Sequence, residues 1–284
     1  MNNFEKWNTY QRERFPLIAY SVLICTLVFA IAGVTHNYDF IAMGQTFVVA
    51  LLMFFLLRVA DEFKDYEDDC KYRSYRAVPR GLVSLKELGI LGVIVLILQI
   101  GLVVFGSIQT IYALGAVLGY WVLMSVEFFV PKWLKAHATI YLLSHMMLMP
   151  MIAWLLLSMM GATVGDEQYV PFLVISFLNG IVLEIGRKIR QKEDEENGVD
   201  TYSALWGKTK AVMVFVLILF CVILVAQLII NSVFIIALLV LFAYIVHISA
   251  KFLQNSEVKG KKIDTLSAVW VLASYLLIGL EGVI

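Results

Sequence analysis

Nine long apolar runs dominate this sequence, and each is long enough to cross about 30 Å of hydrocarbon as a helix. They cover residues 16–35, 40–60, 88–107, 110–130, 137–158, 169–187, 211–230, 232–250 and 264–284. With 61% hydrophobic and 15% charged residues, the chain of 284 residues has too few charges for a soluble domain of this length. We therefore predict an all-α polytopic membrane protein with nine transmembrane helices around a central cavity.

Lysine and arginine mark one side of this predicted bundle. If the N-terminus faces the cytoplasm, the outer connections lie near residues 36–39, 107–110, 159–168 and 231, and none of them contains Lys or Arg. All 22 Lys and Arg residues fall in the N-terminal segment, the other loops or the adjoining helix ends. By the positive-inside rule, the N-terminus and the charged loops are cytoplasmic. We expect an integral protein of a bacterial inner membrane.

No linker or low-complexity segment divides the sequence, so residues 1–284 are expected to form a single membrane domain. Cys25, Cys70 and Cys221 are scattered, which argues against a disulfide framework or a cysteine-based metal site. Nothing indicates a nucleic-acid partner. Membrane lipids are the expected surroundings, and the oligomeric state is not readable from the sequence.

A first acidic cluster follows the run at 40–60. Asp61, Asp65 and Asp69 are four residues apart, so on a continuing helix they would line one face, with Arg58 and Glu62 beside it. Stacked carboxylates repel one another unless cations neutralise them. Mg²⁺ prefers such oxygen ligands and shares its other positions with waters and phosphates. The alternative interpretation is a solvated acidic helix end paired with nearby cations, namely Lys64, Lys71 and Arg73.

A second charged cluster follows the run at 169–187. It mixes cations with carboxylates: Arg187, Lys188, Arg190, Glu193, Asp194, Glu195 and Glu196. Glu195 and Glu196 are best explained as a solvated acidic loop. Glu184 lies deeper in the apolar run, where a carboxylate needs a partner, and Lys188 one turn on is the candidate. In the loop beyond, Asn197-Gly198 indicates a turn, and Asp200 to Gly207 a short helix that ends at Gly207.

The first cluster resembles the first signature of the UbiA superfamily of intramembrane prenyltransferases. That signature is Asn-Asp-x-x-Asp-x-x-x-Asp, followed by a turn like Arg-Pro-Leu-Pro-Ser-Gly. Here the matching run is Asp61-Glu62-Phe-Lys-Asp65-Tyr-Glu-Asp-Asp69, with Arg76-Ala-Val-Pro79-Arg80-Gly81 as the turn. Asp61 replaces the usual Asn and Glu62 the first Asp. The nine-helix count also matches, so the resemblance covers nearly the whole chain.

The second cluster departs from the family's second signature, Asp-x-x-x-Asp before a Gly-x-x-Ser-Thr-x-x-x-x-Gly-like segment. With Gly198 to Gly207 aligned on that segment, Asp194 matches the last Asp, whereas Arg190 stands where the first Asp would be. Either fewer carboxylates hold the second metal, with Arg187 and Arg190 binding diphosphate directly, or ordinary ionising chemistry has been lost.

The resemblance implies a Mg²⁺-dependent enzyme that transfers an isoprenyl group from an isoprenyl diphosphate to an aromatic or other lipophilic acceptor. The metal ligands that it implies are Asp61, Glu62, Asp65, Asp69, Glu193 and Asp194, among which Asp65, Asp69 and Asp194 are the expected catalytic residues. The implied diphosphate contacts are Arg58, Lys64, Arg187, Lys188 and Arg190. His145 and Asn179 could orient an acceptor, although such residues more often make interhelical hydrogen bonds. Glu127 is explained equally well by snorkelling to the surface.

Three other functions are consistent with parts of this pattern. A terpene cyclase of the same fold would capture the allylic cation with the substrate's own double bonds. A transporter of divalent metal or a small solute usually places ionisable groups near the midplane, whereas here they lie at one face. A CDP-alcohol phosphotransferase would need an Asp-Gly-x-x-Ala-Arg run, which the sequence lacks. The acceptor, the prenyl chain length, the choice between transferase and cyclase and the effect of Arg190 remain open at this stage.

Overall fold

The computed structural model describes residues 2–196, 198–254 and 257–284, and helices make up almost all of its regular structure. Nine spans in these residues are long and apolar enough to cross a membrane. They are α2 (Leu17–Thr35), α3 (Phe40–Lys64), α5 (Leu85–Val103), α6 (Ile108–Ser125), α8 (Ala138–Met146) with α9 (Leu148–Met159), α10 (Tyr169–Arg187), α12 (Lys208–Ala226), α13 (Ser232–Gln254) and α14 (Gly260–Glu281). The predicted all-α fold with nine transmembrane helices is confirmed, and the chain is an integral membrane protein.

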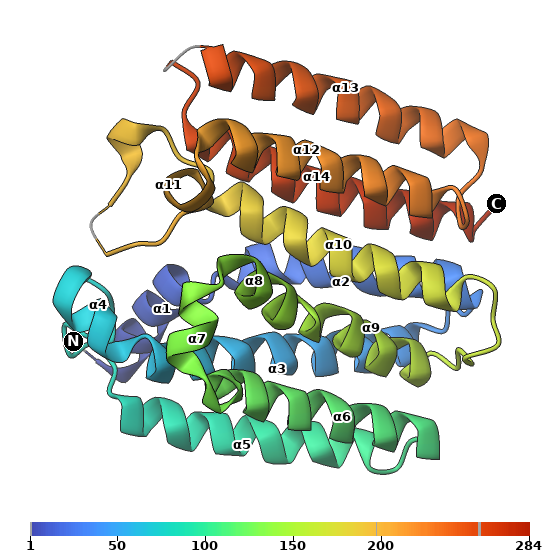
Figure 1. Cartoon of the computed structure of the whole chain (residues 1–284). Helices are drawn as coiled ribbons and strands as arrows, with labels where there is room; N and C mark the ends of the chain where they lie inside the picture. The colour runs from blue at the N-terminus through green and yellow to red at the C-terminus, as the bar shows by residue number, and fades with distance from the viewer. Residues whose placement is uncertain (1, 197, 255–256) are drawn as a thin grey trace.

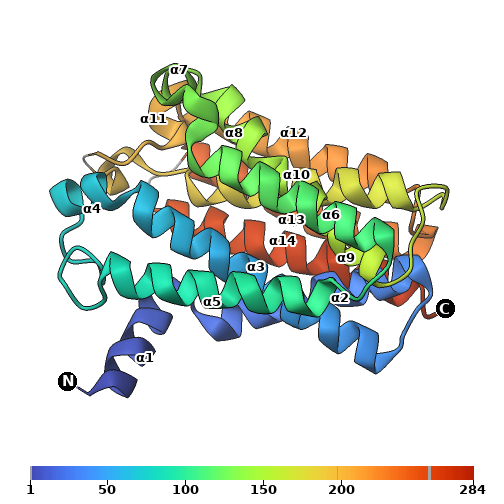
Figure 2. The same ribbon diagram turned by 90° about the horizontal axis from the view of Figure 1, so that it is seen from below.

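Short helices gather at one end of the bundle, where the charged loops also lie (Figure 1). They are α1 (Asn3–Arg14), α4 (Tyr66–Tyr72), α7 (Pro131–Ala136) and α11 (Tyr202–Trp206), with 3-10 turns η1 (Glu127–Phe129) and η2 (Lys192–Asp194). The C-terminus lies at the opposite end (Figures 1 and 2). Because α3 and α10 both run toward the end that carries the short helices, their charged last turns come to the same side of the bundle.

Several helix ends differ from the predicted ones. The run at 40–60 continues as helix to Lys64, beyond its apolar part. The run predicted to extend to residue 130 stops at Ser125, because Glu127, Phe128 and Phe129 have left-handed backbone angles that a helix excludes. The predicted turn begins at Asn197, which lies outside the described residues, and its partner Gly198 has a φ of 76°. The short helix ending at Gly207 is confirmed as α11.

Helices α2 and α14 pack closely because glycines lie between them. A Cβ on Gly33 would lie 2.7 Å from the carbonyl oxygen of Ile278 and 2.9 Å from Cα of Gly279. A Cβ on Gly279 would overlap the ring of Phe29. In lipid, where the hydrophobic effect does not drive helices together, such small residues allow the close van der Waals contact that holds a pair.

We expect Gly33→Ala to destabilise the protein by about 1–3 kcal/mol, because the added methyl group has to push the two backbones apart. Thermal unfolding of the purified protein in detergent measures the change. Gly115→Ala is the matched control, since a Cβ there has no heavy atom within 4 Å. Equal melting temperatures for the two variants would contradict the close packing of α2 on α14.

Candidate functional site

Glu62, near the end of α3, is buried against arginines. Its side chain is 1% exposed, and its Oε1 lies 2.5 Å from Nε of Arg14 and 3.4 Å from Nε of Arg58. Arg14 is the last residue of α1, and its own side chain is only 8% exposed. The N-terminal helix is thus fixed to α3 by a buried ion pair.

Asp69, on α4, is held in the same way. Nη1 of Arg76 contacts both carboxylate oxygens at 2.9 and 2.8 Å, and Nε of Arg73 lies 2.8 Å from Oδ1. Arg14 approaches the second oxygen at 3.6 Å, so it links Asp69 to Glu62. With its oxygens occupied by guanidinium groups, Asp69 could bind a metal only by giving up these contacts.

The carboxylates of this first cluster therefore separate into two sets. The helix is interrupted at Asp65, between α3 and α4, and Glu62 and Asp69 face the arginines. The Asp61 side chain remains 49% exposed, with Arg58 3.5 Å away. Asp65 is half-buried and makes no ion pair among the described residues. Of the carboxylates that the sequence predicted as metal ligands in this segment, Asp61 and Asp65, four residues apart, are the two that remain available to a ligand.

Glu184 of the second cluster is paired at the end of α10. Arg187 binds one carboxylate oxygen, and Nζ of Lys188 lies 3.0 Å from the other. The predicted Glu184–Lys188 pair is confirmed. Arg187 also lies near enough to Asp61 on α3 for the two charges to interact, without forming an ion pair among the described residues. Arg187 nevertheless stays 59% exposed.

Arg190, Glu193 and Asp194 do not continue the face of α10, which ends at Arg187. Gln191 is buried and donates to the carbonyl oxygens of Phe252 and Val258, both at 3.0 Å, which fixes the path of the loop. Glu193 is exposed and Asp194 half-buried. The structure thus brings Arg187 close to the first cluster but does not place these three side chains in contact with it.

The segments that follow α3 and α10 do come into contact, at Tyr72 and Gly198. Gly198 packs against the ring of Tyr72 on α4, where a Cβ would come within 2.5–2.7 Å of the ring atoms. With a φ of 76° as well, this position requires glycine.

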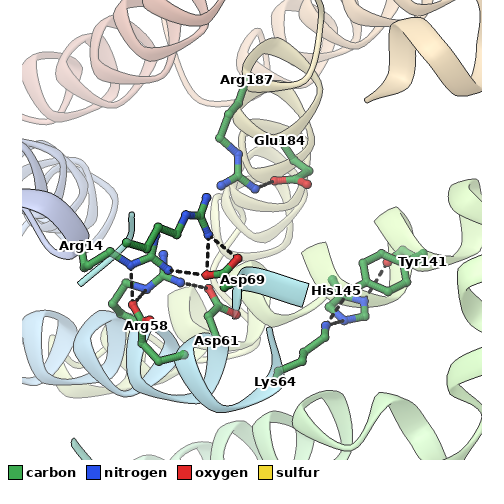
Figure 3. A network of polar contacts seen from close by, with 11 residues as sticks. Arg14, Arg58, Asp61, Lys64, Asp69, Tyr141, His145, Glu184 and Arg187 are labelled. Atoms are coloured by element: carbon green, nitrogen blue, oxygen red, sulfur yellow. Dashed lines mark hydrogen bonds and ion pairs between the residues drawn. The ribbon is translucent and has the colours of Figure 1, made fainter. Parts of the chain in front are cut away.

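Figure 3 shows the charged ends of α3 and α10 in one view, with Arg58 and Asp61 on α3 and Glu184 and Arg187 on α10. The side chains of Asp61 and Arg187 are both accessible to solvent at these two helix ends. A face that presents carboxylates beside exposed guanidinium groups can bind a metal and an anion together.

Lys64 lies beside this face but is engaged by other groups (Figure 3). Its Nζ lies 2.5 Å from the hydroxyl of Tyr141, 3.1 Å from Oε1 of Glu127 and 3.2 Å from Nε2 of His145. The rings of Tyr141 and His145 stack with their centroids 3.9 Å apart. We call these four residues the Lys64 cluster.

Two tyrosines outside the spans stay neutral near the charged groups. Burial raises the pKa of Tyr202, and the negative charge of Glu184 raises it further. Burial and then the charge of Glu62 raise the pKa of Tyr10 in the same way. Both phenols remain protonated at neutral pH and can serve as donors but not as bases.

Mg²⁺ fits part of this site. Among residues 2–196, 198–254 and 257–284, no group of three or more His, Cys, Asp or Glu side chains is arranged to hold a metal. Mg²⁺, however, is usually bound through one or two carboxylates, with waters and substrate phosphates completing its shell. Asp61 and Asp65 meet that requirement, whereas Glu62 and Asp69 are occupied by arginines.

Sequence reasoning missed Arg14 and the roles of Arg76, Glu127 and Tyr141. The Asn2-x-x-Glu5 capping box, present in the structure, is a sequence signal for α1. No sequence signal indicates that Arg14 reaches Glu62, because 48 residues separate the pair. Their contact depends on the packing of α1 against α3.

We expect Asp69→Asn to destabilise the protein by about 3 kcal/mol, because it removes a buried charge that neutralises three partly buried arginines. Thermal unfolding in detergent measures this loss. Asp68→Asn is the control, since Asp68 is 59% exposed and lies 3.9 Å from an equally exposed Lys135. If Asp69→Asn melted no lower than Asp68→Asn, the arginine cluster would have no structural role.

Solved structures share this fold over nearly the whole chain. A structure of digeranylgeranylglyceryl phosphate synthase is 18% identical, with 98% of this chain and 99% of that one covered and a TM-score of 0.67. A UbiA homologue from Aeropyrum pernix K1 is 13% identical, with 92% and 96% covered and a TM-score of 0.65. A UbiA homologue from Archaeoglobus fulgidus bound to DMAPP and Mg²⁺ is 14% identical, with 95% and 98% covered and a TM-score of 0.60.

No curated protein sequence matches the chain significantly. The model of the UbiA prenyltransferase family, in contrast, matches residues 22–272. This match covers most of the sequence and includes both charged clusters, so the predicted resemblance is confirmed: the chain belongs to the UbiA prenyltransferase family.

Proposed function

We propose that the chain is a Mg²⁺-dependent intramembrane prenyltransferase. It transfers an isoprenyl group from an isoprenyl diphosphate to an aromatic or other lipophilic acceptor, and residues 1–284 form one domain whose site faces the cytoplasm. Family membership supports this proposal, as does the similar fold of Archaeoglobus fulgidus homologues bound to DMAPP or GPP with Mg²⁺.

One observation carries the proposal. Asp61 and Arg187, on different helices, are both about half-exposed within the helical bundle and interact electrostatically. Arg58 adjoins them on α3, and Asp65, which forms no ion pair within the described part of the chain, follows directly after that helix. This combination suits a diphosphate and a divalent cation at the membrane surface, with apolar spans beside it for an isoprenyl tail.

The guanidinium groups of Arg58 and Arg187 would bind diphosphate oxygens with paired N–H donors. As the bond between the allylic carbon and its oxygen breaks, negative charge grows on the diphosphate, and donors fixed in advance stabilise that charge. Glu184 orients Arg187 through their ion pair. Mg²⁺ held by Asp61 and Asp65 would supply Lewis-acid stabilisation of the same charge. The apolar helices exclude water from the allylic cation.

The contacts of the other residues predicted for the site indicate a role for each. We assign Glu62 and Asp69 to the support of Arg14, Arg58 and Arg76, which keeps the end of α3 in place. Lys64 belongs to the neighbouring Lys64 cluster. Lys188 forms an ion pair with Glu184.

For the loop after α10, we keep the sequence-based prediction that Arg190 contacts the diphosphate and that Glu193 and Asp194 contact the metal. Asp194, which is half-buried, is the stronger candidate of the two carboxylates, because Glu193 is exposed to solvent.

We expect Asp61→Asn and Asp65→Asn each to lower Mg²⁺-dependent release of diphosphate from geranylgeranyl diphosphate on the order of 10²-fold, the loss typical of one electrostatic contact to a developing charge. Purified protein in lipid nanodiscs and a diphosphate assay measure the rate. Asp68→Asn, an exposed carboxylate on the same segment, is the control. Full activity in both Asp61→Asn and Asp65→Asn would rule out this site.

A further inference from the structure

A groove of about 710 Å³ lies between α1, α3 and α5. Apart from Gln11 and Glu87, its lining residues are apolar or aromatic. Three of them, Leu17, Ile90 and Ile94, are exposed on the outer surface of the membrane spans. A groove walled by exposed apolar side chains of membrane spans is open to the bilayer, so its occupant comes from the bilayer.

The groove runs from the charged end of the bundle into the membrane. Its lining on α5 extends from Glu87 to Val95, which is about 12 Å along a helix. Glu87 belongs to the first turn of α5, next to the charged loops, whereas Val95 lies in the middle of that span. A polar mouth and an apolar interior suit a lipid, with the headgroup at the mouth and an acyl chain inside.

Lys6 and Glu87 form an ion pair at this mouth. Nζ of Lys6 bonds to Oε1 of Glu87 and lies 5.9 Å from the ring centre of Trp7, which also lines the groove. Oε2 of Glu87 accepts from the backbone N–H and the hydroxyl of Ser84, both at 2.9 Å. These contacts fix the pair between α1 and α5, although the Glu87 side chain stays 42% exposed.

Both members of this pair can form further bonds. An ammonium group has three N–H donors, and within the described part of the chain that of Lys6 donates to Glu87 alone. Oε1 of Glu87 accepts from Lys6 alone among the same residues, and a carboxylate oxygen can accept twice. The mouth therefore offers donors for an anionic group directly beside an acceptor for a cationic one.

A headgroup that carries both charges complements this mouth. A phosphate would bind the remaining N–H groups of Lys6, and a primary ammonium would donate to Oε1 of Glu87, as charge-assisted hydrogen bonds. A choline ammonium has no N–H to donate. An anionic headgroup without an ammonium would face the Glu87 carboxylate and leave it without the second bond. Ethanolamine is the headgroup that makes both contacts.

We propose that this groove is a binding site for phosphatidylethanolamine, with an acyl chain between α1, α3 and α5 and the headgroup at Lys6 and Glu87. The lipid fills the space beside α1, the helix whose last residue, Arg14, holds Glu62 and Asp69. It therefore stabilises the docking of the N-terminal helix on the spans. This binding does not depend on the proposed reaction.

Native mass spectrometry of the full-length protein in detergent tests the assignment. The protein is titrated separately with dioleoyl phospholipids that carry ethanolamine, choline or glycerol, so only the headgroup differs. We expect one ethanolamine lipid to bind per chain about tenfold more tightly than the choline lipid, the value of one hydrogen bond to a charged group. The glycerol lipid should bind no more tightly than the choline lipid.

Two variants separate the headgroup contacts. Glu87→Gln keeps a residue that can cap α5 and should reduce the affinity for the ethanolamine lipid to that for the choline lipid. Lys6→Met removes the phosphate contact, so it should weaken binding of both lipids about tenfold and leave the preference for ethanolamine in place. Lys86→Met is the control, since Lys86 is exposed on α5 and should weaken neither lipid.

A third variant locates the acyl chain. Ile94→Trp narrows the groove and should weaken binding of both lipids, whereas Ile97→Trp should not, because Ile97 is exposed on the same helix but does not line the groove.

Several outcomes would overturn the assignment. They are equal affinities for the three lipids in the unmodified protein, tighter binding of the glycerol lipid, or a preference for ethanolamine that survives Glu87→Gln. Dimers in place of lipid-bound monomers would assign the groove to a second copy of the chain and would also refute it. Because each headgroup preference is a ratio of two lipids on the same folded protein, a lower yield of a variant does not mimic its loss.

Discussion

The burial of Glu62 and Asp69 among arginines is the interaction on which the rest of this site depends. Arg14 contacts both carboxylates, so one side chain from α1 joins the end of α3 to α4. Removing ions from water is costly, and it is offset here only because each carboxylate meets more than one guanidinium. The result is a rigid base at the membrane surface, from which Asp61 and Asp65 remain free to meet a ligand.

This arrangement separates structural from ligand-binding charges within one short motif. Neighbouring carboxylates differ because their surroundings differ: Glu62 is 1% exposed and Asp61 49%. On α10 the balance is reversed, since the carboxylate Glu184 is the more buried partner and the cation Arg187 is presented to the site. A face built from two carboxylates, the exposed Arg187 and the half-buried Arg58 can neutralise a diphosphate with less help from metal than a face of carboxylates alone.

Much of the fold could be predicted from the sequence, because apolar length and the distribution of Lys and Arg depend only on local composition. The nine spans follow from such local rules and are present in the described residues of the structure. The pairing of charges could not be predicted, since Arg14 and Glu62 meet only through the packing of α1. Spacing placed Asp61, Asp65 and Asp69 on one face, but the interruption at Asp65 directs Asp69 to Arg73 and Arg76. Nor does the sequence indicate that Lys64, an expected diphosphate contact, lies against Tyr141 on α8.

Electron–nuclear double resonance on protein in which Mn²⁺ replaces Mg²⁺ tests the central claim most directly, because it reads the ligands of the metal. With a non-hydrolysable isoprenyl diphosphate analogue bound, the account predicts a ³¹P coupling to the metal that is lost in the Asp61→Asn, Asp65→Asn double variant. The coupling should persist in Glu62→Gln protein that remains folded. Retention of the coupling in the double variant, together with its loss in folded Glu62→Gln, would show that the arginine-bound carboxylates hold the metal and would contradict the account.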